Sequence, residues 1–283
     1  MYSHRILGQG AVDGYLKGKG NLDVATSFSG NSAERFLGSS GNVYDLKYKG
    51  SLLSLFAELG LSDNFDLVAV GAVVFTPSLS GFQDGAIYAK YRLGIWEVKK
   101  GYRLHVISAL GASFPLSNYK PTANGALGTK AITVQPRFIL QLETPPGFFV
   151  NLTGGYNWRL DEPSKADILE VQNTRPDFQP GSPSNFTTYM VKFGFPAAHY
   201  YLDTWFEWQT TNGGSNYVPD LTDLPQLYGV SYKQVGGTAY YSDSGKNGFY
   251  LSAGYILGGR NVSQIFRITG GYVFKLTSGS KKA

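Results

Sequence analysis

Residues 249–276 read FYLSAGYILGGRNVSQIFRITGGYVFKL, which is two alternating runs joined by Gly258-Gly259-Arg260-Asn261. In the second run, one parity is apolar and the other is polar: Val262, Phe266, Ile268, Tyr272, Phe274 and Leu276 against Ser263, Arg267, Thr269 and Lys275. Successive side chains of a strand point to opposite faces, so the hairpin has an apolar face and a polar face. The apolar face would pack on a core in a soluble protein, but would meet lipid in an outer-membrane barrel. The hairpin alone fits both arrangements.

Composition narrows the choice of fold. The chain has 283 residues, no Cys and a net charge of +5, and its mean hydropathy is −0.16. Without Cys there is no disulfide framework and no thiolate metal site. No run of about eighteen apolar residues occurs, so no transmembrane helix is expected and only a closed barrel could cross a membrane. The basic residues are scattered, which argues against a nucleic-acid partner. Residues 1–14 lack the apolar core of a signal peptide, so for an exported protein we expect this sequence to be a processed or recombinant form.

The two-residue alternation continues from Asn21 to the final hairpin. It predicts about twelve strands, whose connections alternate between short and long. That is the arrangement of a transmembrane up-and-down antiparallel β-barrel with short periplasmic turns and longer outer loops. We therefore expect an all-β fold with a barrel over residues 19–276. Residues 1–18 would form an irregular N-terminal segment, either periplasmic or a partial plug, and residues 277–283 a C-terminal tail. The tight turn at 258–261 predicts a low barrel rim there.

Aromatic residues mark both ends of several predicted strands. Four of them open a strand after a short turn, and four others follow on the same parity: Phe65, Tyr102, Phe148 and Tyr200, then Phe75, Phe114, Trp158 and Trp208. A tilted spanning strand needs about nine to eleven residues, with aromatic side chains at both interfaces. The spacing predicts two aromatic girdles on a lipid-facing surface.

The polar parity carries the candidate functional residues. A charge facing lipid at mid-depth would cost about 2–4 kcal/mol, so charged side chains of spanning strands should point into the lumen. The predicted pore-lining residues are Glu58, Lys90, Arg92, Arg103, Arg137, Arg159, Lys192, Asp203, Glu207 and Arg267. They could form a weakly basic pore that favours anionic or polar solutes. Alternatively, they could form ion pairs that close a narrow barrel.

Catalytic and metal sites find little support in the sequence. The three His residues are His4, His105 and His199, and His105 should face inward near the periplasmic end. A barrel phospholipase would need a lipid-facing His–Ser pair near the outer rim, so we expect no enzyme. Acidic residues such as Asp161, Glu162, Asp220 and Asp223 in predicted outer loops match no defined calcium loop. We expect no metal and no cofactor.

Three stretches resemble a known family. They are LFAELGLSDNFDL at residues 55–67, GFQDGAIYAKYRL at 81–93 and LGASFP at 110–115. These are similar to the E-Y-G-L-T-D-like turn, the G-x-x-D…K-Y-R-L strand and the G-x-x-x-P strand end of bacterial barrels grouped as the MetA-pathway of phenol degradation family. Here Leu59 replaces the usual Tyr and Ser62 the usual Thr. The resemblance implies an outer-membrane channel, and the family name suggests hydrophobic or aromatic cargo.

The sequence as a whole therefore predicts a barrel of the bacterial outer membrane that passes small solutes passively. The expected partners are the lipid bilayer with its lipopolysaccharide, a small solute and no nucleic acid. One alternative is a non-conducting barrel that anchors other surface proteins, with its lumen closed by residues 1–18. Another is a basic pore for acidic oligosaccharides.

Overall fold

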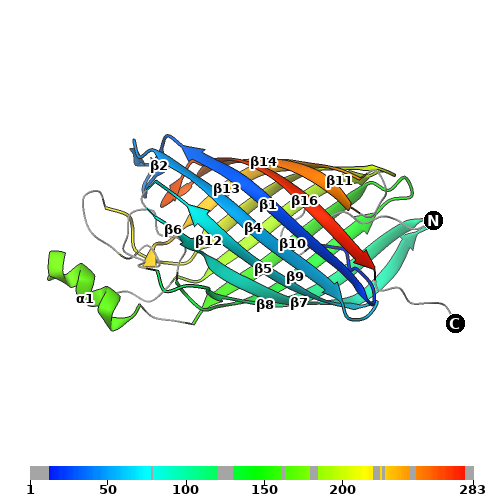
Figure 1. Cartoon of the computed structure of the whole chain (residues 1–283), viewed down its shortest axis with the longest axis horizontal. Helices are drawn as coiled ribbons and strands as arrows, with labels where there is room; N and C mark the ends of the chain where they lie inside the picture. The colour runs from blue at the N-terminus through cyan, green and yellow to red at the C-terminus, as the bar shows by residue number, and fades with distance from the viewer. Residues whose placement is uncertain are drawn as a thin grey trace.

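The computed structural model describes residues 13–77, 79–119, 130–160, 163–178, 184–218, 224, 227–242 and 247–277. Within these ranges, twelve long antiparallel strands form one closed barrel (Figure 1). They are β1 (Asn21–Ala33), β4 (Tyr48–Gly60), β5 (Phe65–Phe75), β7 (Asp84–Lys99), β8 (Tyr102–Pro115), β9 (Thr133–Glu143), β10 (Phe149–Arg159), β11 (Phe186–Pro196), β12 (Tyr200–Thr211), β13 (Ser231–Tyr241), β14 (Asn247–Arg260) and β16 (Phe266–Thr277). The predicted fold class is confirmed.

Each barrel strand pairs with the barrel strands that precede and follow it in the chain. The sheet closes because β1 also pairs antiparallel with β16, from Asn21 opposite Thr277 to Ser32 opposite Phe266. This up-and-down order leaves no open edge in the barrel wall. It is the topology that the alternating short and long connections predict.

The two ends of the barrel differ in their connections. The short turns 61–64, 100–101, 144–148 and 197–199 lie at one end, where β1 begins and β16 finishes. The longer connections lie at the other end, together with α1 (Lys165–Thr174), β2 (Phe36–Leu37), β3 (Val43–Tyr44), β6 (Ser80–Phe82) and β15 (Val262–Ser263) (Figure 1). Short turns face the periplasm in barrels of this kind, so the second end is the outer end.

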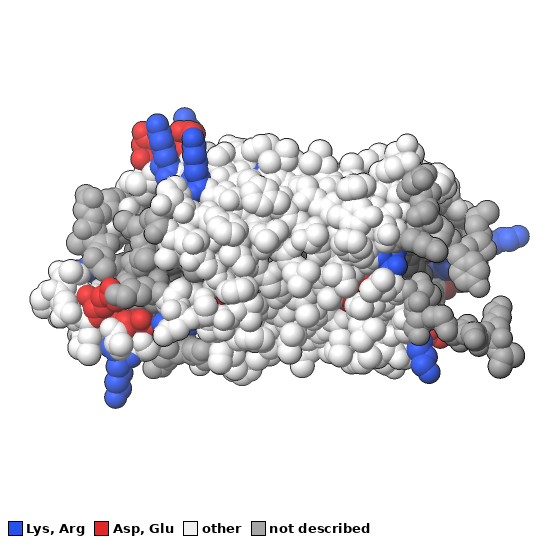
Figure 2. Space-filling view, in the orientation of Figure 1, with Lys and Arg blue, Asp and Glu red and all other residues white. Residues whose placement is uncertain are grey.

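The outer wall of the barrel is apolar. Leu55, Leu110 and Leu251 are exposed by 57%, 58% and 56% although they occupy central strand positions. Figure 2 shows a largely uncharged middle, with Lys, Arg, Asp and Glu side chains gathered toward the two ends. In water such a surface would be an aggregation hazard, whereas in a bilayer it is the surface that contacts lipid.

Aromatic side chains stand near both ends of this apolar band. Phe148 and Tyr200 are exposed near the periplasmic end, and Phe75 and Trp158 are exposed near the outer end. The other predicted girdle residues, Phe65, Tyr102, Phe114 and Trp208, are partly exposed. Trp208 stacks on Tyr189 of the neighbouring strand with ring centroids 5.2 Å apart.

The final hairpin differs from the prediction. Gly258 and Gly259 do not turn the chain but continue β14, opposite Lys233 and Tyr232 of β13. The chain turns after Arg260 instead, where Asn261 has a φ of 53°. Val262 then pairs with Leu37, so that β15, β2 and β3 form a small sheet. The predicted low rim is wrong, because pairing between two distant outer loops extends the wall at this place.

The start of α1 and the start of β13 define two of the connections at the outer end. The helix α1 begins after Ser164, whose hydroxyl accepts a hydrogen bond from the Asp167 amide. The strand β13 begins at Ser231, after the described residues 227–230 of the preceding connection. Among the described helical residues, none belongs to a helix long and apolar enough to span a membrane.

Candidate functional site in the barrel lumen

The inward parity of the strands concentrates polar side chains in the lumen. Asp23, Asp66, His105, Gln141 and Asn151 are each exposed by no more than 5%. They lie on five different strands, because each strand contributes every second residue to the interior. The interior of the barrel is therefore a polar compartment enclosed by an apolar wall.

Residues 13–17 lie inside this compartment, at the periplasmic end. The Tyr15 ring contacts Phe149 edge to face at 5.7 Å, and Phe149 stacks on Tyr201 at 5.9 Å. Tyr15 belongs to a buried cluster with residues of β1, β10, β12, β13 and β16. The next residue, Leu16, belongs to a second cluster formed by β5, β7, β8 and β9. Since the two clusters lie on different arcs of the wall, this segment bridges the lumen.

Ion pairs hold the segment in place. Lys90 Nζ lies 2.7 Å from Asp13 Oδ1 and 2.6 Å from Glu58 Oε1, and it donates a hydrogen bond to the Tyr15 carbonyl oxygen at 2.6 Å. Lys17 Nζ lies 2.9 Å from Asp23 Oδ2 and 3.2 Å from Glu58 Oε2. Glu58 therefore bridges both lysines, one from the wall and one from the segment.

The backbone of the segment is also bound to the wall. The Lys17 amide donates a hydrogen bond to Asp66 Oδ2 at 2.7 Å. Burial alone would lower the pKa of Lys17, but the carboxylates of Glu58, Asp23 and Asp13 outweigh it and the pKa is raised. The cation of Lys17 is thus stable at any physiological pH.

Glycine permits the close approach of segment and wall at two positions. A Cβ at Gly14 would collide with the side chain of Gln141, and a Cβ at Gly60 would collide with the backbone of Gly18. Neither position has a left-handed φ, so close packing rather than backbone conformation explains the glycine. Gly60 also accepts a hydrogen bond from the Gly20 amide at 2.8 Å, just before β1 begins.

The lumen nearer the outer end contains a cavity of about 540 Å³, which we call the outer chamber. Its lining combines aromatic surfaces with a few charged groups: Phe56, Trp205, Tyr232 and Tyr250, with Lys192, Glu207 and Arg267. The Tyr232 hydroxyl donates to Glu207 Oε1 at 2.5 Å. Arg267 Nε donates to Asn31 Oδ1 at 2.7 Å, and the Arg267 side chain remains exposed. The chamber thus offers flat apolar surfaces beside a guanidinium group.

The residues predicted to line a pore fall into separate groups inside the barrel. Lys192, Glu207 and Arg267 border the outer chamber, and Lys192 Nζ also lies 3.5 Å from Asp203 Oδ2. Glu58 and Lys90 contact the N-terminal segment instead. Arg137 and Arg159 lie over the rings of Tyr88 and Phe186, at 5.0 and 5.3 Å.

The remaining predicted residues lie at the periplasmic end. Arg92 Nη1 donates to the Asp63 carbonyl oxygen in a short turn at 3.2 Å. Arg103 Nη2 lies 2.9 Å from Glu143 Oε2, and its side chain is 54% exposed. The buried His105 ring places Nε2 3.2 Å from the same Glu143 oxygen, which matches the expected inward orientation of this histidine.

Sequence reasoning missed the contribution of Asp13, Tyr15, Leu16 and Lys17. They lie in a Gly-rich stretch without periodicity, so no pattern singled them out. Residues 1–12 of the predicted segment, residues 278–283 of the predicted tail and the loop acids Asp161, Glu162, Asp220 and Asp223 lie outside the described residues. Within the described ranges, no group of three or more His, Asp or Glu side chains is arranged to hold a metal ion.

Comparison with known proteins gives a family and two similar folds. Residues 18–268 match the family model described as putative MetA-pathway of phenol degradation. The fold is similar to an outer membrane channel from Pseudomonas putida F1, with a TM-score of 0.66, 15% identity, and 96% of this chain and 100% of that chain covered. It is also similar to the NanC porin, with a TM-score of 0.56, 11% identity, and coverage of 90% and 100%. No curated protein matches the sequence.

The ion pairs of Lys90 make a testable prediction about the segment. Lys90→Met would leave Asp13 and Glu58 buried beside an apolar side chain, which costs about 3–5 kcal/mol when a buried pair is broken. The segment should then leave the lumen, and trypsin should cleave after Lys17 much faster than in the unchanged protein. The exposed Lys100 in a short turn provides the control Lys100→Met. Equal cleavage rates in both variants would contradict the role of Lys90.

Proposed function

The chain belongs to the MetA-pathway of phenol degradation family, and from this membership we propose that it is an outer-membrane channel for the passive passage of small solutes. The barrel is a transmembrane barrel of the outer membrane, and the folds similar to it include an outer membrane channel and a porin. A channel requires a compartment that solutes can enter. The outer chamber, at about 540 Å³, is the observation that supports this function best.

The lining of the chamber supports a cargo with an apolar, aromatic body. Phe56, Trp205, Tyr232 and Tyr250 present rings to the cavity, and aromatic rings prefer offset-stacked or edge-to-face contacts with one another. The description of the family also points to aromatic compounds. Such a compound would exchange contacts with water for contacts with these side chains, which favours entry without an energy source.

We further propose that residues 13–17 act as a partial plug at the periplasmic end. Tyr15 and Leu16 fill the lumen between two clusters of wall residues, and the ion pairs of Lys17 and Lys90 fix them there. A solute in the outer chamber would have to pass this constriction to reach the periplasm. Displacement of the segment would widen the path.

The same contacts support an alternative, in which the barrel does not conduct and serves as an anchor for other surface proteins. In that case the segment is a permanent stopper whose ion pairs never open. The two functions differ in whether removal of the segment exposes a continuous path and whether the unchanged protein passes solutes at all. Neither assigns a chemical reaction to the protein.

Conductance across a planar bilayer tests the plug. Deletion of residues 1–18 should raise the single-channel conductance severalfold, because Tyr15 and Leu16 no longer occupy the lumen. Tyr15→Gly with Leu16→Gly should raise it less but in the same direction, and this variant retains Lys17 to hold the segment. If neither variant conducts better than the unchanged protein, the segment is not the constriction.

Charge reversal tests the lining of the chamber. Arg267→Glu should shift the ion selectivity toward cations, because Arg267 is an exposed cation in the chamber. Lys233→Glu is the matched control, since Lys233 is exposed on β13 next to the chamber residue Tyr232 and so points to the outer face. If the two variants have the same ion selectivity, Arg267 does not line the pore.

Current block by a small aromatic solute tests the cargo. Phenol, added to the outer side of the Tyr15→Gly, Leu16→Gly variant, should reduce the ion current at concentrations at which glycerol does not. Replacement of Trp205 by Ala should weaken the block, because one ring of the chamber is lost. Equal effects of phenol and glycerol would argue against an aromatic cargo while leaving the channel function intact.

A further inference from the structure

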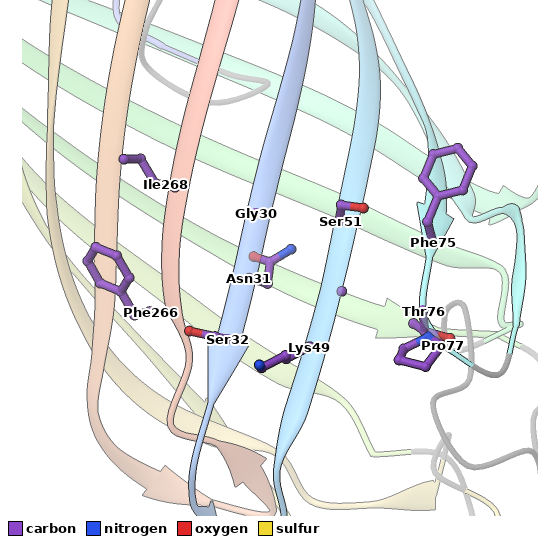
Figure 3. A pocket seen from close by; sticks show the side chains of 11 residues that line it. Gly30, Asn31, Ser32, Lys49, Ser51, Phe75, Thr76, Pro77, Phe266 and Ile268 are labelled. Atoms are coloured by element: carbon purple, nitrogen blue, oxygen red, sulfur yellow. The ribbon is translucent and has the colours of Figure 1, made fainter.

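A second hollow lies on the outside of the barrel wall, near the outer end. It has a volume of about 650 Å³ and crosses β16, β1, β4 and β5, and we call it the wall groove. Figure 3 shows Phe266 and Ile268 on one side of it, Phe75 and Pro77 on the other, and Gly30, Ser51 and Lys49 between them. It is separate from the outer chamber, which lies on the inner side of the same wall.

Strand register explains the shape of the wall groove. Ile268 lies opposite Gly30, Gly30 lies opposite Ser51, and Ser51 lies opposite Phe75. Two large side chains therefore flank two small ones across four adjacent strands. With neighbouring strands about 4.8 Å apart, the small pair leaves a depression wide enough for hydrocarbon chains.

The wall groove also has a direction. The next line of paired residues toward the outer rim has Ser32 between Phe266 and Lys49, and Lys49 is exposed. In the row nearer the middle of the membrane, the outward residues are Phe28 and Leu53, exposed by 56% and 46%. The groove thus runs from a cation at the rim to an apolar surface deeper in the bilayer.

We propose that the wall groove binds a phosphorylated glycolipid of the outer leaflet, the lipid A part of lipopolysaccharide. Its acyl chains would lie over Gly30 and Ser51 between Ile268 and Phe75, and a sugar phosphate would contact Lys49. The order of cation and apolar surface matches a lipid whose phosphate lies outward and whose chains point inward. Lipid A is the chosen occupant because the groove lies at the end with the long loops, in the leaflet that lipopolysaccharide forms.

Native mass spectrometry of the full chain in detergent micelles tests this site with purified lipid A as the probe. Lys49→Gln should weaken lipid A binding about fivefold, since a basic residue near an anionic lipid surface contributes about 1 kcal/mol. Gly30→Leu should weaken binding as strongly or more, because the added side chain fills the floor. A Cβ at Gly30 comes no nearer than 3.9 Å to Ile268 Cγ2, so the wall can accept the substitution.

Two matched control variants change residues of β13 and β14 that do not line the wall groove. Lys233 and Gly258 are paired neighbours in β13 and β14 near the outer end, and a Cβ at Gly258 would meet no atom within 4 Å. Lys233→Gln and Gly258→Leu should leave lipid A binding unchanged. The proposal is overturned if Lys49→Gln and Gly30→Leu weaken lipid A binding no more than the two control variants do. It is also overturned if phosphatidylglycerol binds the unchanged protein as tightly as lipid A.

Discussion

The structure depends on the hydrogen bonds that join β1 to β16. Inside a hydrocarbon layer no water is present to satisfy backbone amide and carbonyl groups, so a sheet that crosses it cannot leave an open edge. The first and last barrel strands meet this requirement through a continuous ladder from Asn21 opposite Thr277 to Ser32 opposite Phe266. Closure also divides every strand into an outward parity that contacts lipid and an inward parity enclosed by the wall.

Enclosure changes what the polar residues can do. Charges that would be costly on the lipid side are accommodated in the lumen, where they find partners on other strands. Glu58 shows the effect most clearly, because its carboxylate contacts Lys90 from β7 and Lys17 from the N-terminal segment. Tyr15 and Leu16 pack against wall residues toward the periplasmic end, whereas the outer chamber lies nearer the outer end. The two ends of the lumen therefore differ in their contents as well as in their connections.

Much of the fold could be predicted from local patterns. The alternation around Arg267 and Ile268 predicts one side chain in the lumen and the other on the outer wall; Arg267 borders the outer chamber and Ile268 is exposed. The lengths of the connections predict which end faces the periplasm. The errors fall where distant segments meet. The sequence predicts a turn at Gly258 and Gly259, but pairing of Val262 with Leu37 in another loop carries the wall further outward. No sequence pattern predicts α1, because Pro163 precedes it and Pro176, Pro180 and Pro183 follow it closely.

The sequence by itself determined the barrel and its strand number, and it predicts the face on which a strand residue lies, because a period of two is a local property of the extended backbone. Register shifts near Arg92 and Lys233 interrupt that period. The sequence also predicts that the charged residues of the spanning strands point into the lumen. Only the tertiary structure decided which of them meet: Asp13 and Lys90 are 77 positions apart and become partners because the closed wall surrounds the segment that carries Asp13. Periodicity says which way a side chain points, but the contacts across the lumen depend on the curvature and closure of the whole sheet.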